Sequence, residues 1–279
     1  MTLEARWQAA GAQWRAALAA PVSLAIPVHF RPGGLRHFGA PPPRSEPLRV
    51  GGFTGDVRQG ASCNCHSITL TPHCHGTHTE CVGHLTDATI HVREIAPRGL
   101  LPALVLSVPL FAVAATDETT RPPPAAGDRL VTREALATAL QALPARDAAL
   151  PVEALVLRTL PNDERKFTRD YSDGSAAYLT LEAVAWLLER GVRHLVLDLP
   201  SVDRSHDEGE LAGHRLFFGL PPRGESGAPA PARARCTVTE LAYVPRDVHD
   251  GAVLLQLTLP ELDGDAVPST PLVYRLEHA

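Results

Sequence analysis

Several features that the sequence lacks narrow its class before any motif is considered. No apolar run approaches the ~20 residues of a membrane-spanning helix. The net charge of −5 provides no basic footprint for nucleic acid. Aromatic residues make up only 5% of the chain and Lys166 is its only lysine, which we attribute to genome composition. We therefore expect neither a membrane nor a nucleic acid as a partner.

Signs of secretion are also missing. Glu4, Arg6 and Arg15 interrupt the apolar residues of the N-terminus, so it does not resemble a secretory signal. The cysteines number five, and four of them lie close to histidines. An odd, clustered set favours reduced thiols or metal ligands over a disulfide framework. We expect a cytoplasmic protein.

The rest of the chain has the pattern of a mixed α/β protein that is rich in strands. Apolar runs at 101–110, 152–160 and 194–200 predict buried strands, and a helix at 181–190 opened by Thr180 separates the last two. This order predicts a right-handed crossover. Further strands are expected at 22–30, 67–72, 237–245, 252–260 and 272–277, and a helix capped by Thr132 at 133–143.

The N-terminal segment is expected to be separate from this domain. Leu3, Trp7, Trp14 and Leu18 recur at multiples of three to four residues, which predicts a helix over 3–19. We expect this helix within residues 1–20 and a single domain over 21–279. The spacing does not separate a helix docked on its own domain from one that forms a dimer contact.

Residues 63–84, CNCHSITLTPHCHGTHTECVGH, are the most informative part of the chain. They contain four of the five cysteines and five of the thirteen histidines. Thiolates, imidazoles and carboxylates at short spacing are ligands for a transition metal of the zinc type. A core strand would not tolerate so many polar atoms without partners. The segment therefore predicts a metal or catalytic site.

The alternation of side chains along an extended strand places four residues of this segment on one face. Cys74, His78, Glu80 and His84 share the even parity of an extended strand and would face one side. They also fit helical spacing, but the glycines and β-branched residues between them disfavour a helix. We prefer the extended interpretation. Cys63 and Cys65 are then interpreted as small core residues or as supports outside the ligand set.

The same segment carries a resemblance to a known family. HGTHTECVGH resembles the signature His-x-Gly-Thr-His-x-Asp-x-Pro-x-His of the cyclase family, which includes bacterial kynurenine formamidase and isatin hydrolase. Four further segments resemble family segments in the same order. They are SLAIPV at 23–28, HLVLDLPSVD at 194–203, GHRLFF at 213–218 and TELAYV at 239–244.

This resemblance implies a metal-dependent hydrolase with a swivelling β/β/α fold, peripheral helices and a homodimeric or homotetrameric assembly. Carried over by position, Cys74, His78 and Glu80 would hold a first divalent metal. Glu80, His214 and Glu240 would hold or approach a second. The resemblance implies zinc as the metal, with manganese as the alternative.

The family also implies a reaction. A metal lowers the pKa of its bound water to about 7, and the resulting hydroxide would attack a small amide, formamide, or cyclic amide or ester. His84 would be the catalytic residue that moves the proton, first as base and then as acid. We expect a small-molecule substrate, which the sequence does not name.

Three positions depart from the family signature. Cys74 replaces its first histidine, Glu80 its aspartate and Val82 its proline. His73 and His75 flank Cys74, and either could take its place as a ligand.

Other residues near these motifs receive simpler interpretations. His206 is a rival for the role of His214. Asp198 and Asp203 follow a strand and are interpreted as turn caps. Cys236 is interpreted as structural.

Two further hypotheses stay open. In the first, a protein without catalysis holds a structural metal through four thiolates, a closed set that leaves no open position. Its ligands would be Cys63, Cys65, Cys74 and Cys81. In the second, a family member binds a small ligand without turning it over.

Overall fold

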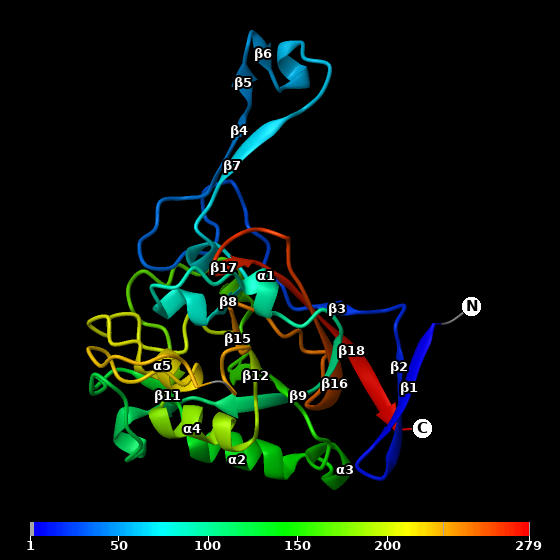
Figure 1. The fold of residues 1–279 in the computed structure, drawn as a ribbon, viewed down its shortest axis with the longest axis vertical. Coiled ribbons are helices and arrows are strands. Elements are labelled where there is room, and N and C mark those ends of the chain that lie inside the picture. The colour runs from blue at the N-terminus through cyan, green and yellow to red at the C-terminus, as the bar shows by residue number, and fades with distance from the viewer. Residues whose placement is uncertain (1–2, 231, 279) are drawn as a thin grey trace.

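A large mixed β-sheet forms the centre of the protein (Figure 1). The computed structural model describes residues 3–230 and 232–278. Four neighbouring strands in the middle of the sheet run parallel. They are β9 (Leu100–Pro109), β12 (Ala154–Leu160), β14 (His194–Leu197) and β15 (Thr237–Glu240). The predicted mixed α/β, strand-rich class is confirmed.

Antiparallel strands extend the sheet on both sides. Beyond β9 lie β16 (Gly251–Thr258), then β18 (Thr270–His278), which also pairs with the short β3 (Val22–Ser23). Beyond β15 lie β8 (His78–Cys81) and β17 (Ala266–Pro268). The sheet therefore brings three segments far apart in the sequence side by side at this end.

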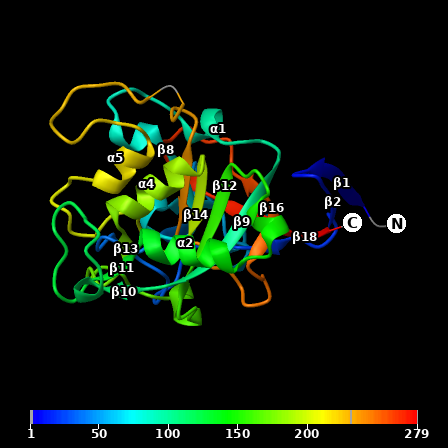
Figure 2. The same cartoon turned by 90° about the horizontal axis from the view of Figure 1, so that it is seen from below.

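Helices cover one face of the parallel strands (Figure 2). They are α2 (Arg133–Ala142), α4 (Leu181–Glu189) and α5 (Ala212–Phe217), and the shorter α1 (Val92–Ile95) and α3 (Ala145–Ala148) lie nearer the edges of the body. The predicted caps are confirmed, because Thr132 accepts from the backbone N–H of Ala135 and Thr180 from that of Ala183. No helix among the described residues is long and apolar enough to span a bilayer.

The central strands are apolar on both faces. Successive side chains of a strand point to opposite sides, so Leu155 and Leu157 pack toward the helices. Ala154 and Val156 pack into a second cluster on the other face. Burial on both faces explains why these strands are continuous apolar runs rather than alternating ones.

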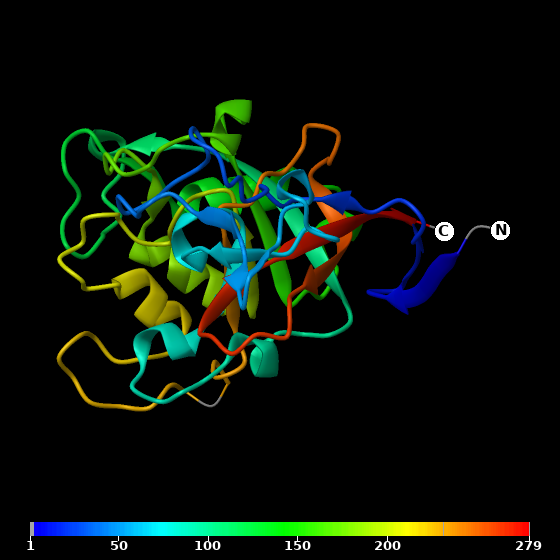
Figure 3. The same ribbon diagram turned by 90° about the horizontal axis from the view of Figure 1, so that it is seen from above.

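A two-stranded arm projects from the body in Figure 1 and points toward the viewer in Figure 3. Its stem pairs β4 (Arg44–Pro47) with β7 (His66–Thr69), and its tip pairs β5 (Arg49–Val50) with β6 (Phe53–Thr54). Cys63 and Cys65 lie on this arm and are exposed, so the prediction that they are small core residues is wrong. The body does not cover the arm, and the two thiols have no core to enter.

A second small sheet lies beside the helices. It contains β10 (Phe111–Ala112), β11 (Arg129–Val131) and β13 (Tyr178–Leu179).

The predicted N-terminal helix is wrong. The segment forms a hairpin of β1 (Glu4–Ala9) and β2 (Ala12–Ala17), in which Trp7 stands opposite Trp14. Ala10 and Gly11 form the turn with φ values of 51° and 73°, the left-handed pair that a two-residue hairpin requires. Alanine permitted a helix, but the alternation of tryptophan and alanine also fits a strand, and β2 gains partners on β18.

We predict that Trp14→Ala destabilises the protein by about 3–5 kcal/mol, because its side chain is buried in the main core. Leu3→Ala, at an exposed residue beside the hairpin, should change stability by less than about 0.5 kcal/mol. Urea unfolding followed by circular dichroism measures both. Equal effects would contradict the docking of this hairpin on the body.

Candidate metal centre

Strand pairing places three of the predicted residues together. His78 and Glu80 are two residues apart on β8, so their side chains leave the same face of the sheet. The antiparallel register sets Glu240 of β15 directly opposite His78. The Nε2 atom of His78 lies 3.4 Å from a carboxylate oxygen of Glu240. All three side chains are buried.

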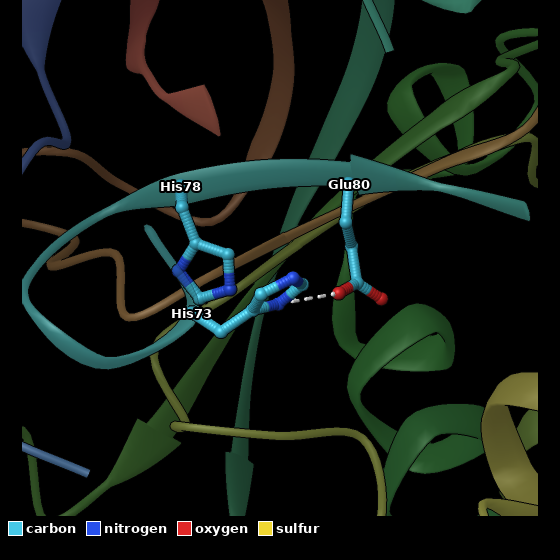
Figure 4. A group of neighbouring side chains, drawn as sticks. All are labelled: His73, His78 and Glu80. Atoms are coloured by element: carbon cyan, nitrogen blue, oxygen red, sulfur yellow. Dashed lines mark ion pairs between the residues drawn. The ribbon is translucent and has the colours of Figure 1, made fainter. Parts of the chain in front are cut away.

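His73 joins these residues in place of Cys74 (Figure 4). The Nδ1 atom of His73 lies 3.1 Å from a Glu80 oxygen, and ligand atoms of His73, His78 and Glu80 lie within 4.8 Å of one another. Cys74 is buried but belongs to no such group, so the structure does not bring this predicted ligand to the site.

The extended stretch is shorter than alternation over residues 74–84 requires, so Cys74 does not share the face of His78 and Glu80. Residues Pro72–Cys74 and Val82–Leu85 form 3-10 turns on either side of β8. Gly76 connects the first turn to the strand with a φ of 148°, and a Cβ there would lie 3.0 Å from the carbonyl oxygen of Ile26. Alternation therefore holds only within the four residues of β8.

His214 reaches the site from helix α5. Its Nε2 atom lies 2.9 Å from one Glu80 oxygen and 3.3 Å from a Glu240 oxygen. Ligand atoms of these three residues form a second group within 4.8 Å, so the structure brings together the residues that the family resemblance implied. Glu80 belongs to both groups and joins them into one centre.

The two aspartates interpreted as turn caps have other roles. Asp203 accepts from the backbone N–H groups of Gly213 and His214, and its Oδ2 atom lies 2.7 Å from Nδ1 of His214. It therefore orients a residue of the site. Asp198 accepts from Thr159 and from the Lys166 ammonium, which fastens the end of β12. The interpretation of both as turn caps is wrong.

Each of the three clustered histidines has one ring nitrogen held by an oxygen acceptor outside the cluster. Such contacts fix the tautomer and orientation of metal-binding imidazoles in proteins. The pairs are His73 Nε2 with Asp265 Oδ2 at 3.1 Å, His78 Nδ1 with Gly76 O at 3.1 Å, and His214 Nδ1 with Asp203 Oδ2 at 2.7 Å.

The inward-facing atoms are close together without well-directed hydrogen bonds. Nε2 of His78, Nε2 of His214 and both oxygens of Glu80 are buried and have no hydrogen-bond partner of acceptable geometry among residues 3–230 and 232–278. Buried polar atoms are rarely left in this state unless something else satisfies them. A divalent cation would satisfy all of them, and imidazole with carboxylate is a donor set that zinc and manganese accept. The residues therefore fit a metal.

The charges of the cluster agree with this interpretation. Burial alone would raise the pKa of Glu80, but the imidazoles of His214, His73 and His84 together outweigh burial and hold that pKa well below its usual range. Burial opposes protonation of His214, yet Glu80 and Asp203 raise its pKa well above the ordinary value. Positive charge is thus favoured at this position, and a bound cation would replace the protons.

His84 lies at the edge of the centre. Its Nδ1 atom is 3.1 Å from Asp265 Oδ2, and its ring centroid is 4.3 Å from that of His73 and 6.1 Å from that of His214. His73, His84 and Asp265 form a third, more accessible group. Asp265 was missed by sequence analysis because it lies 181 residues from His84 and belongs to no recognisable motif.

The remaining predicted residues lie elsewhere. His206 is exposed beside Gly174, so it does not replace His214. His75 accepts from the backbone N–H of Thr71 through Nδ1. Cys236 is buried in the main core, as predicted.

The thiols do not form the alternative metal site. Cys63 and Cys65 are exposed on the arm, whereas Cys74 and Cys81 are buried in the body. No group of metal-ligating residues found in the described part of the chain contains a cysteine. The four-thiolate hypothesis therefore has no support.

The fold is strand-rich and mixed α/β, and carboxylates and imidazoles gather beside the strands β8 and β15 of its sheet. A family model described as "Putative cyclase" matches residues 16–204, more than half of the chain. The chain belongs to this cyclase family. No curated protein matches it.

Solved structures with the same fold share little sequence with the chain. Isatin hydrolase A from Labrenzia aggregata is 17% identical with a TM-score of 0.60, over 91% of this chain and 93% of that one. Isatin hydrolase A from Ralstonia solanacearum is also 17% identical with a TM-score of 0.60, over 92% of this chain and 91% of that one. A predicted metal-dependent hydrolase from Bacillus stearothermophilus is 14% identical with a TM-score of 0.55, over 91% of this chain and 98% of that one. These likenesses show the fold.

We predict that His73→Ala weakens zinc binding at least 10-fold, because it removes an imidazole of the centre, whereas Cys74→Ala leaves binding within 2-fold. Competition with a chromophoric chelator measures both affinities. A larger loss of zinc affinity in Cys74→Ala than in His73→Ala would show that Cys74 is the ligand.

Proposed function

We propose that this protein is a metal-dependent hydrolase of a small amide, formamide, or cyclic amide or ester. The observation that carries the proposal is the pair of ligand groups that share Glu80. The family match supports it, as do the structural relatives whose names include isatin hydrolase. Cyclic amides such as isatin and N-formyl arylamines such as formanilide are therefore the first compounds to assay.

Zinc is the metal that we propose, with manganese as the alternative. His73, His78 and Glu80 would hold one ion, and Glu80, His214 and Glu240 would hold or approach a second. A divalent ion there would polarise the carbonyl and lower the pKa of a water molecule to about 7. The ligands contain only nitrogen and oxygen, so no thiolate charge weakens the Lewis acidity of the ion.

His84 is the residue that we propose for proton transfer. With Nδ1 close to the Asp265 carboxylate, Nε2 is the ring nitrogen left to exchange protons. Nε2 would take a proton from the attacking water and give it to the leaving nitrogen or oxygen. The side chain is 28% exposed, which allows the ring to meet a substrate.

We predict that His84→Ala lowers kcat by about 10²–10⁴-fold while metal content is unchanged, because the proton carrier is lost and the two ligand groups that share Glu80 remain. His66→Ala, on the projecting arm, is the matched control and should keep full activity. Steady-state kinetics and elemental analysis give both quantities. Full activity of the His84 variant would remove this residue from the mechanism.

We also propose that the protein is cytoplasmic and forms a homodimer or homotetramer. The five unpaired cysteines support a reducing compartment. The arm supports association with a second copy, because a lone two-stranded ribbon is marginally stable and this one exposes Val50, Val57 and Ile68.

We predict that Ile68→Glu lowers the association of copies at least 10-fold, because a charge would enter an apolar contact, and that Leu262→Glu, at an exposed leucine outside the arm, has no effect. Sedimentation equilibrium measures the mass of each. A wild-type protein that is monomeric at micromolar concentration would contradict the proposal.

A further inference from the structure

Asp265 is held firmly beside the candidate metal centre. Its carbonyl oxygen accepts the backbone N–H of Cys81 at 3.0 Å, and the next residue, Ala266, pairs with Glu80 in the β17–β8 ladder. The preceding Gly264 accepts the backbone N–H of Val92. Contacts on both sides thus fix the Asp265 backbone against the strand that carries His78 and Glu80.

One carboxylate oxygen of Asp265 lies between two imidazoles. Its Oδ2 atom is 3.1 Å from Nε2 of His73 and 3.1 Å from Nδ1 of His84. A carboxylate oxygen accepts hydrogen bonds, so an imidazole that donates to Oδ2 carries a proton on the nitrogen that faces Asp265.

We propose that Asp265 is a positioning residue that serves the metal centre through His73 and proton transfer through His84. For His73, the contact leaves Nδ1, which faces Glu80, as the nitrogen with a free lone pair. For His84, it leaves Nε2 as the basic atom. The proposal rests on the proposed hydrolase function, and it assigns one side chain to both halves of that function.

Each of the two roles proposed for Asp265 has a known physical basis. A carboxylate that accepts the second N–H of a metal-binding histidine orients the ring and raises its basicity, and its loss costs 10–100-fold in affinity or activity. A carboxylate behind a general base selects the tautomer and stabilises the imidazolium that forms. Asp265 has the contact that each role requires, and the same oxygen makes both.

We predict that Asp265→Ala weakens zinc binding about 10–100-fold, measured by chelator competition without substrate. At saturating zinc we expect kcat to fall about 10–100-fold while KM stays within 2-fold, because proton transfer rather than substrate binding is affected. Asp265→Asn keeps the shape and one acceptor and should lie between Asp265→Ala and wild type. Asp263→Ala, at a nearby exposed carboxylate that pairs with Arg93, is the matched control and should change neither quantity.

Double variants test whether Asp265 acts through the two histidines. Adding Asp265→Ala to His84→Ala should lower kcat no further, and adding it to His73→Ala should weaken zinc binding no further. Additive losses would overturn the proposal. So would a kcat that excess zinc fully restores, or one fewer bound zinc in His84→Ala, which would make His84 and Asp265 ligands of a third ion.

Failure of the hydrolase function gives a different result. A wild-type protein that binds no divalent metal, or hydrolyses none of the test compounds, would remove the function itself. If the wild type binds zinc and hydrolyses a test compound, and the Asp265→Ala variant has the same zinc affinity and kcat, only the role of Asp265 is removed.

Discussion

The buried carboxylate of Glu80 is the constraint on which the site depends. An isolated charge with no solvent exposure is costly, so the fold must surround it with groups of opposite charge. Its two oxygens lie 2.9 Å from His214 and 3.1 Å from His73, on different elements. Helix α5 and the 3-10 turn before β8 therefore each deliver an imidazole to this one side chain.

The scaffold under the site makes that convergence rigid. Strands β12 and β14 are buried on both faces, and their C-terminal ends are tied by the only lysine of the chain. The Lys166 ammonium donates to Asp198 at 2.5 Å and to the Thr159 carbonyl at 3.1 Å, and both acidic and basic partners are buried. A residue whose scarcity reflects composition thus has a structural role here, since losing either partner would leave a buried charge.

Features that depend on interactions between residues close in sequence could be predicted from the sequence. Features that depend on pairing between distant segments could not. Helices capped by Thr132 and Thr180 and the doubly buried strands depend on local patterns, and these predictions were confirmed. The helix at 3–19 failed because the hairpin depends on pairing with the distant β18. His78 and Glu80 followed from strand alternation, but Asp265 is placed by a ladder between segments far apart in the chain, which no local pattern encodes.

Two of the three departures from the family signature, at Cys74 and Glu80, meet in the structure. Replacing an aspartate by Glu80 extends the carboxylate by one methylene, and the imidazole that it meets comes from His73, one residue before the expected position. These two side chains face each other, with Nδ1 of His73 3.1 Å from the Glu80 oxygen. A longer carboxylate thus meets an earlier histidine, which lies in the 3-10 turn Pro72–Cys74. Cys74 is thereby released from the centre, and burial raises the pKa of its thiol, which keeps it protonated and uncharged.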